Sequence, residues 1–210
     1  LAGAAVAWLA FRRIGSGGLV QTIERNPSGC KASLGAELVA ACAVGFLILF
    51  GFIGVFTYVN FVLMRPPLSL NQMQLGLVYL LFAPSIVTTP LAGRLALKIG
   101  ARRAVVASLA LATIALPALL VGSVWTIIAG LAVVASGTFI AQAVVTGYVS
   151  RTMSLDRGTA CGLYLGCYFL GGITGATAVG WLFETYGWSA SVAGVGVAFC
   201  IAAALASRLE

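Results

Sequence analysis

Residues 104–150 read AVVASLALATIALPALLVGSVWTIIAGLAVVASGTFIAQAVVTGYVS, and none of these 47 residues is charged. At a rise of about 1.5 Å per residue, one helix of this length would measure roughly 70 Å, whereas the hydrocarbon core of a bilayer is about 30 Å thick. The stretch therefore predicts two membrane-spanning helices that are joined by a turn near Gly122 and Ser123. We place these two spans at residues 104–121 and 125–150.

Four further apolar segments of spanning length flank this pair, at residues 37–63, 73–92, 158–183 and 189–206. The composition of the whole chain agrees, because 61% of the residues are hydrophobic and only 8% are charged, against roughly 25% charged residues in soluble domains. The predicted fold class is all-α. It is a polytopic membrane protein whose six transmembrane helices form one bundle over residues 37–207.

The basic residues occupy alternate loops between these spans. Eleven of the twelve lie on one side of the predicted membrane, in residues 12–36, 93–103 and 151–157 and in the tail at 208–210, and only Arg65 lies on the other. The eleven are Arg12, Arg13, Arg25, Lys31, Arg94, Lys98, Arg102, Arg103, Arg151, Arg157 and Arg208. By the positive-inside rule their side is cytoplasmic. We therefore expect a multi-pass protein of the bacterial inner (plasma) membrane, and we interpret the net charge of +7 as membrane sidedness rather than nucleic-acid binding.

Several functional classes lack the residues that their chemistry requires. The chain contains no His, and its five Cys show no metal-ligand spacing, so we expect no metal site and no cofactor. An intramembrane serine protease would need a nucleophile paired with a His, and we predict that the protein is not an enzyme. A channel or a non-transporting membrane scaffold remains the alternative to a transporter, although no pore-lining repeat is visible.

The most specific local pattern is the predicted cytoplasmic loop Gly93-Arg-Leu-Ala-Leu-Lys-Ile-Gly-Ala-Arg-Arg103. Its composition alone indicates an ordinary positive-inside loop. Its spacing, however, resembles a signature of the major facilitator superfamily, Gly-x3-Asp-(Arg/Lys)-x-Gly-(Arg/Lys)-(Arg/Lys), which lies between the second and third helices of each six-helix half. Leu97 replaces the acidic residue and Ala101 replaces one basic residue. The second copy of the signature is often degenerate, so both departures fit a C-terminal half.

The resemblance extends over nearly the whole chain and implies a role for each part. Residues 1–11 would end a preceding transmembrane helix, and residues 12–36 would be the central cytoplasmic loop that joins the halves. Residues 56–60, 137–143 and 158–188 look most like efflux permeases of the acriflavine-sensitivity and arabinose-efflux type. The implied conformational loop consists of Gly93, Arg94, Lys98, Gly100, Arg102 and Arg103.

The resemblance also implies a function and partners. Two six-helix halves would surround a central site and expose it alternately to each side of the membrane. The expected function is secondary active transport of a small molecule, in the direction of efflux, with a drug-like, sugar or metabolite substrate. The partners would be that substrate, the lipid bilayer, a missing N-terminal six-helix half and, if transport is proton-coupled, protons. No ionisable residue lies deep in a predicted span, so a proton carrier would belong to the missing half.

Polar residues recur at helical spacing within the predicted spans. Thr138, Gln142, Thr146 and Ser150 form one stripe with a spacing of four. This stripe could line a wet cavity or form hydrogen bonds between helices, and the spacing leaves both interpretations open.

Tyrosines and glycines follow the same spacing on two other spans. Glycines such as Gly51, Gly54, Gly171 and Gly175, and the pair Gly162 and Gly166, favour close helix packing. Tyrosines are better cavity candidates because each offers a ring for stacking and a hydroxyl group. The candidate substrate-binding residues are Tyr58, Asn60, Gln142, Thr146, Tyr164 and Tyr168.

Overall fold

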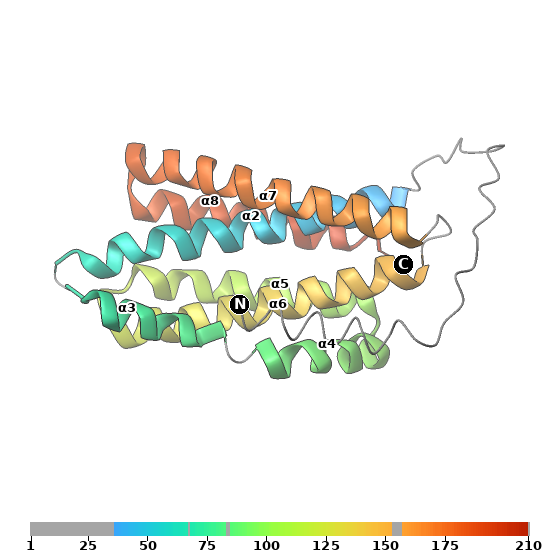
Figure 1. The fold of residues 1–210 in the computed structure, drawn as a ribbon, viewed down its shortest axis with the longest axis horizontal. Helices are drawn as coiled ribbons and strands as arrows, with labels where there is room; N and C mark the ends of the chain where they lie inside the picture. The colour runs from blue at the N-terminus through green and yellow to red at the C-terminus, as the bar shows by residue number, and fades with distance from the viewer. Residues whose placement is uncertain (1–35, 67, 83–84, 153–156, 210) are drawn as a thin grey trace, which may run out of the picture. The chain divides into compact units, whose positions relative to one another are not determined.

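The computed structural model describes residues 36–66, 68–82, 85–152 and 157–209, and all of the regular structure in these residues is helical (Figure 1). The elements are α2 (Ala36–Met64), α3 (Gln72–Val78), η1 (Tyr79–Phe82), α4 (Ser85–Ile99), α5 (Ala101–Ala115), η2 (Leu116–Leu120), α6 (Val124–Thr152), α7 (Arg157–Tyr186) and α8 (Trp188–Ala206). The segments predicted at 1–11 and, apart from Ala36, at 12–36 lie outside the described residues, as does most of the loop at 151–157.

Five helical segments of the described residues are long and apolar enough to cross a membrane. They are α2, α5 continued by η2, α6, α7 and α8, and their mean hydropathies run from 1.3 to 2.7. They correspond to five of the six predicted spans. The prediction of an all-α, multi-pass membrane protein is therefore confirmed, whereas the count of six continuous spans is not.

The predicted second span, at residues 73–92, is wrong as a single helix. The chain forms the short α3, then the 3₁₀ segment η1, and starts again as α4 at Ser85. The sequence places Pro84 between these pieces. Proline has no N–H to donate, disfavours helical geometry at the residue before it and is tolerated at the start of a helix. Hydropathy alone carries no signal for such a break.

The start of α3 is fixed by a capping box. The side chain of Asn71 accepts a hydrogen bond from the backbone N–H of Gln74 at 2.9 Å, and the side chain of Gln74 accepts one from the N–H of Asn71 at 3.0 Å. Two backbone donors that would otherwise lack partners at a helix start are thereby paired. The segment thus begins as a well-defined helix although it runs for only seven residues.

The predicted basic loop at 93–103 is also corrected. Helix α4 continues to Ile99 and α5 starts at Ala101, so Gly100 alone joins the two helices. Gly93 lies inside α4, and Gly100 has a φ of +86°. Alanine, leucine, lysine and arginine are good helix formers, which explains why the charges after Gly93 do not end the helix. The reversal depends on Gly100 because a side chain is strained at this φ.

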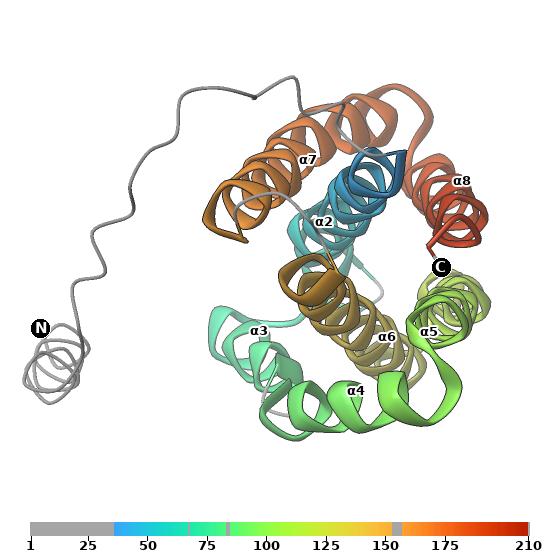
Figure 2. The same ribbon diagram turned by 90° about the vertical axis from the view of Figure 1, so that its right-hand side faces the viewer.

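The helices pack as two groups, α2 with α7 and α8, and α4 with α5 and α6, which meet where α2 contacts α6 and where α8 contacts α5 (Figure 2). Helix α2 lies against α7 and α8, and α5 lies against α6 and α8. Glycines allow the closest approach: a Cβ atom on Gly171 would collide with the carbonyl oxygen of Phe46, and one on Gly175 with that of Phe50. The predicted packing role of these glycines is confirmed. In the described part of the chain, a Cβ atom added to Gly162 or Gly166 would meet no atom within 4 Å. This pair therefore makes no close contact with another described helix.

The basic side chains gather toward one end of the described bundle. Helices α4, α6 and α8 end there, and α2, α5 and α7 begin there (Figure 1). Among the described residues only Arg65, just past the end of α2, lies at the opposite end. This distribution supports the predicted sidedness of the chain.

Gly100 and Gly93 give a matched pair of alanine substitutions in one helical hairpin. Gly100→Ala should destabilise the protein by about 1 to 3 kcal/mol because alanine is strained at the φ of Gly100. Gly93→Ala should be neutral or stabilise by about 0.5 to 1 kcal/mol, because Gly93 is exposed inside a helix and its Cβ would meet no atom within 4 Å. Thermal unfolding of the purified protein in detergent measures both effects. Equal midpoints for the two variants would contradict the assigned turn.

Candidate functional site

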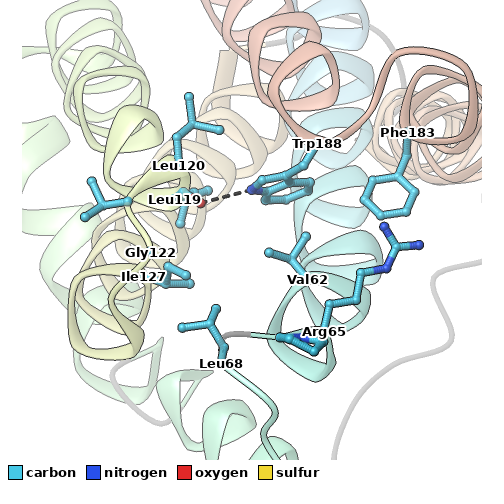
Figure 3. A pocket seen from close by; sticks show the side chains of 11 residues that line it. Val62, Arg65, Leu68, Leu119, Leu120, Gly122, Ile127, Phe183 and Trp188 are labelled. Carbon is cyan, nitrogen blue, oxygen red and sulfur yellow. Dashed lines mark hydrogen bonds between the residues drawn. The ribbon is translucent and has the colours of Figure 1, made fainter.

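Two of the cavities in the described part of the chain lie at the end that carries Arg65. The smaller, of about 240 Å³, is lined by the ends of α2, η2, α7 and α8 (Figure 3). Its polar groups are already engaged: Trp188 Nε1 donates a hydrogen bond to the Leu119 carbonyl at 2.9 Å, and the guanidinium carbon of Arg65 lies 5.4 Å from the centre of the Phe183 ring. This arrangement ties the helix ends together and leaves few groups for a ligand.

The other cavity at this end, of about 600 Å³, lies between the start of α3 and the start of α6. Most of its lining is apolar and includes Leu77 and the exposed Trp125. Of its polar residues, Gln74 is engaged in the capping box of α3. The position at the helix ends and the lack of convergent polar groups make it a poor candidate for a specific site.

A third cavity, of about 480 Å³, lies between α2 and η1. Its lining consists of Phe52, Ile53, Phe56, Thr57, Asn60, Phe61, Met64, Tyr79 and Phe82. On α2 the lining forms two adjacent rows with a spacing of four, which starts at Phe52 and Ile53 and places them on one helix face. Phe52 is two residues beyond residue 50, the midpoint of α2. The cavity therefore extends from the middle of a spanning helix toward one end.

Aromatic rings form most of the wall of this cavity. The ring centres of Phe52 and Phe56 are 4.6 Å apart, and those of Phe56 and Phe82 are 4.9 Å apart. Phe139 of α6 extends the cluster, at 5.4 Å from Phe52 and 6.0 Å from Phe82. These separations fall in the range in which rings attract one another. The cluster connects three separate elements, α2, η1 and α6.

One polar pair lies in this aromatic wall. The side-chain amide of Asn60 donates hydrogen bonds to the hydroxyl oxygen of Tyr79 at 2.7 Å and to the Phe56 carbonyl at 2.9 Å. The first bond joins α2 to η1, and the second fixes the rotamer of Asn60. The sequence-based candidate Asn60 is thus placed at the cavity, together with Tyr79.

A second polar cluster connects α6 and α7 near α2. The hydroxyl of Tyr164 donates to Oε1 of Gln142 at 2.7 Å and also lies beside Thr146. Tyr168 stacks on Tyr164 with ring centres 6.3 Å apart. Tyr164 is only 1% exposed, and its ring packs against Gly45 of α2. Four of the six predicted residues therefore meet in one place, as an interhelical hydrogen-bond cluster apart from the aromatic cavity.

The sixth predicted residue, Tyr58, points elsewhere. Its hydroxyl donates to the Ala176 carbonyl of α7 at 2.8 Å, and its ring lies 5.4 Å from Phe183. Gly180 leaves room for it, because a Cβ atom there would contact the Tyr58 ring and hydroxyl. In this structure Tyr58 joins α2 to α7 and does not line the cavity of Asn60.

The sequence-based selection missed eight of the nine residues of the cavity wall, among them Phe52, Phe56, Tyr79 and Phe82. The spacing of Phe52, Phe56 and Asn60 could have indicated a common helix face. Tyr79 and Phe82 could not be placed without knowledge of the break in the second span. The residues assigned to the conformational loop that carry charge, Arg94, Lys98, Arg102 and Arg103, are exposed around Gly100.

Comparison with known proteins identifies the family. A family model described as Major Facilitator Superfamily matches residues 41–209, most of the chain. The chain belongs to the major facilitator superfamily. This membership agrees with the resemblance of the 93–103 segment and places the chain among transporters rather than enzymes.

Curated relatives are described as transporters. The chain is 29% identical over 168 residues to an uncharacterized transporter of Buchnera aphidicola subsp. Baizongia pistaciae, and covers 41% of it with 79% of its own length. It is also 29% identical over 168 residues to the inner membrane transport protein YnfM of Escherichia coli, with 80% of the chain and 40% of the relative covered. The chain thus spans about two fifths of the length of these relatives.

The fold has a counterpart among solved structures. A crystal structure of a mutant of the peptide transporter POT in complex with sulfate matches with a TM-score of 0.70 and 18% identity, over 82% of this chain and 38% of that chain. At this identity the match supports the fold alone. The described helices therefore share the helical arrangement of the matched part of that transporter.

Removing one hydroxyl tests the buried cluster around Tyr164. Tyr164→Phe should destabilise the protein by about 1 to 3 kcal/mol, because Gln142 Oε1 loses its donor while it stays half-buried. The control is Tyr186→Phe, which removes a hydroxyl from a 65% exposed tyrosine and should leave stability nearly unchanged. Thermal unfolding of the purified protein compares the two. If Tyr164→Phe were as stable as the control, the hydrogen bond between Tyr164 and Gln142 would make no contribution to the stability of the fold.

Proposed function

We propose that this chain is the C-terminal half of a secondary active transporter that moves a small molecule by alternating access. The observation that carries the proposal is the cavity between α2 and η1, which lies against an interrupted helix in a chain of the major facilitator superfamily. Its volume of about 480 Å³ falls in the range of small-molecule sites. Polar and aromatic side chains converge there from separate elements.

The interruption of the second segment supports this assignment. In transporters, binding sites commonly lie where a membrane helix is broken, because the freed backbone groups must face protein or a wet cavity. Tyr79 and Phe82 of η1 contribute to the cavity wall. Segments of 3₁₀ helix inside longer helices also often mark hinges. The same break could therefore both shape the site and allow it to open.

In this proposal α3, η1 and α4 together cross the membrane once, between α2 and α5, and so add a sixth crossing to the five spanning helices. They run from Gln72 to Ile99, 28 residues that would extend about 42 Å if helical throughout, which exceeds the bilayer core of about 30 Å. In Figure 1 α3 and α4 follow one another along the bundle, from the end near Arg65 to the opposite end. If the chain crosses the membrane here, the basic residues that follow all lie on the cytoplasmic side, as the positive-inside rule requires.

The proposed partners follow from the length of the relatives and the absence of buried charge. The chain covers about two fifths of its curated relatives, so we assign the other wall of the cavity to an N-terminal six-helix half. In the described residues the central parts of the five spanning helices contain no Asp, Glu, Lys or Arg. If transport is coupled to protons, the titrating group belongs to that other half.

We further propose a bacterial inner-membrane location and transport in the direction of efflux. The basic end of the bundle would face the cytoplasm. The E. coli relative is described as an inner membrane transport protein, and the sequence resembles efflux permeases at residues 56–60. Within this half, Asn60 would bind substrate together with Tyr79. Gln142, Thr146, Tyr164 and Tyr168 would position α6 and α7 beside the site, and Tyr58 would fix α2 on α7.

The alternative is a channel or a non-transporting scaffold. Flux measurements on the full-length protein in proteoliposomes separate these classes. Saturable movement that an imposed gradient can drive indicates a carrier, whereas unsaturable conductance indicates a pore. No flux of any member of a panel of aromatic compounds, sugars and amino acids would favour a scaffold.

Substitution of Asn60 tests the site itself. Asn60→Ala removes the hydrogen bonds to Tyr79 and Phe56, and in the full-length protein it should lower kcat/KM for the transported compound about tenfold, the equivalent of roughly 1.4 kcal/mol. The matched control is Gln72→Ala, which removes an exposed amide in the first turn of α3 outside the cavity. Unchanged kinetics for Asn60→Ala at normal expression would remove Asn60 from the site.

Accessibility labelling tests the interrupted span. In a cysteine-free version of the full-length protein, Ser69→Cys should react with a membrane-impermeant maleimide from outside the cell, and Lys98→Cys only after permeabilisation. Glu184→Cys and Arg208→Cys serve as references for the outer and inner sides. If Ser69→Cys and Lys98→Cys labelled from the same side, α3, η1 and α4 would not form a membrane crossing.

A further inference from the structure

We propose that the cavity between α2 and η1 accepts an uncharged, planar aromatic molecule that carries one hydroxyl-like group. The inference rests on the proposed function, since it assigns a substrate class to the same cavity. It excludes sugars and carboxylates from this half of the site. Three features of the wall support it: the ring cluster, the unused polar atoms of one pair, and the lack of charge.

The ring cluster presents flat apolar surfaces from three elements. Phe52, Phe56, Phe82 and Phe139 form a continuous set with ring centres 4.6 to 6.0 Å apart. Three of them, Phe52, Phe56 and Phe82, line the cavity. A flat guest ring can join such a cluster in a stacked or an edge-on geometry, which adds an attraction beyond the area that it buries. A saturated ring of the same size gains only the free energy that comes from burying its apolar surface.

The polar pair can still bind one further group. All three hydrogen bonds of the Asn60 side chain, to Tyr79 at 2.7 Å and to the carbonyls of Phe56 at 2.9 Å and Thr57 at 3.4 Å, use its amide nitrogen as the donor, and Tyr79 acts as an acceptor. Among the described residues, no partner is assigned to the carbonyl oxygen of Asn60 or to the hydroxyl hydrogen of Tyr79. The pair thus offers one acceptor and one donor side by side. A ligand hydroxyl can use both because it donates once and accepts as well.

The lining carries no charge to balance a charged ligand. Of its nine residues only Thr57, Asn60 and Tyr79 are polar, and none is ionisable near neutral pH. Moving an ion into such surroundings costs several kcal/mol without a partner charge. The cation closest in sequence, Arg65, has its guanidinium over the Phe183 ring. Three polar side chains are also too few to satisfy the several hydroxyl groups of a sugar.

A matched set of probes tests this assignment by equilibrium binding to the purified full-length protein. 2-Naphthol is planar and aromatic with one hydroxyl, and decahydro-2-naphthol keeps the hydroxyl and the carbon skeleton but loses the rings' aromaticity. 2-Naphthoate replaces the hydroxyl with a carboxylate, and glucose represents the sugars. We expect 2-naphthol to bind at least about twofold more tightly than its saturated analogue, which is the lower end of the ring contribution. The other two probes should bind more weakly still.

Two variants link that preference to the cavity. Phe52→Leu keeps an apolar side chain but removes a ring, so it should weaken 2-naphthol binding about 3- to 10-fold and leave decahydro-2-naphthol nearly unchanged. The control is Phe46→Leu, the same substitution on the same helix outside the cavity lining. Asn60→Leu should weaken binding of both hydroxyl compounds.

Several outcomes would overturn the inference. Equal binding of 2-naphthol and its saturated analogue would indicate an apolar groove for lipid tails, and tighter binding of 2-naphthoate or glucose would indicate a different substrate class. An equal loss in Phe52→Leu and Phe46→Leu would place the probe elsewhere. Flux assays test the transporter proposal separately from the aromatic substrate class. Gradient-driven transport of a sugar or carboxylate, with no preference for aromatic rings, would support the transporter proposal and contradict the aromatic substrate class. Ring-dependent binding without flux of any compound in the panel would support the aromatic ligand class and contradict the transporter proposal.

Discussion

Backbone hydrogen bonding is the constraint on which this structure depends. A lipid environment offers no water to a main-chain N–H or C=O group, so each one must find a partner within the protein. Long helices satisfy this requirement along their own length, and α2, α6 and α7 each continue for 29 or 30 residues. The one break between Gln72 and Ile99 needs a different solution. Its 3₁₀ part, η1, contacts α2 through Tyr79 and α6 through Phe82, while Leu80 is exposed.

The second determinant is close contact between α2 and α7. In lipid, helices gain little from hiding apolar surface, so they associate through tight packing and a few hydrogen bonds. Gly171 and Gly175 bring α7 against the backbone of α2. The hydroxyl of Tyr58 adds a bond to Ala176 across the same interface. These contacts fix one side of α2 on α7 and orient the opposite row, from Phe52 to Asn60, toward η1.

Hydropathy and charge predicted the helical class, five spans and the grouping of basic residues, because lipid thickness sets the length of an apolar segment. They could not predict that α-helix stops at Val78 and starts again at Ser85, since such an interruption changes the backbone without much changing hydropathy. The direction in which each side chain of α2 points could not be predicted from the sequence either. Tyr58 and Asn60 are about 200° apart on a helix, but α2 has too few polar residues for a polarity pattern to tell which of the two faces the protein. Phe52 and Phe56 were missed because phenylalanine is equally suited to lipid, to a core and to a cavity wall.

The bond between Asn60 and Tyr79 has a thermodynamic consequence. It joins a continuous helix to an interrupted one, and its two residues also line the cavity. A guest that binds one position of η1 better than another must shift the balance between those positions, by as much as its affinities for them differ. The coupling is reciprocal, so whatever moves η1 also changes how tightly the guest is held. If the cavity binds the proposed guest, its occupancy and the conformation of the interrupted helix are therefore coupled in a single equilibrium.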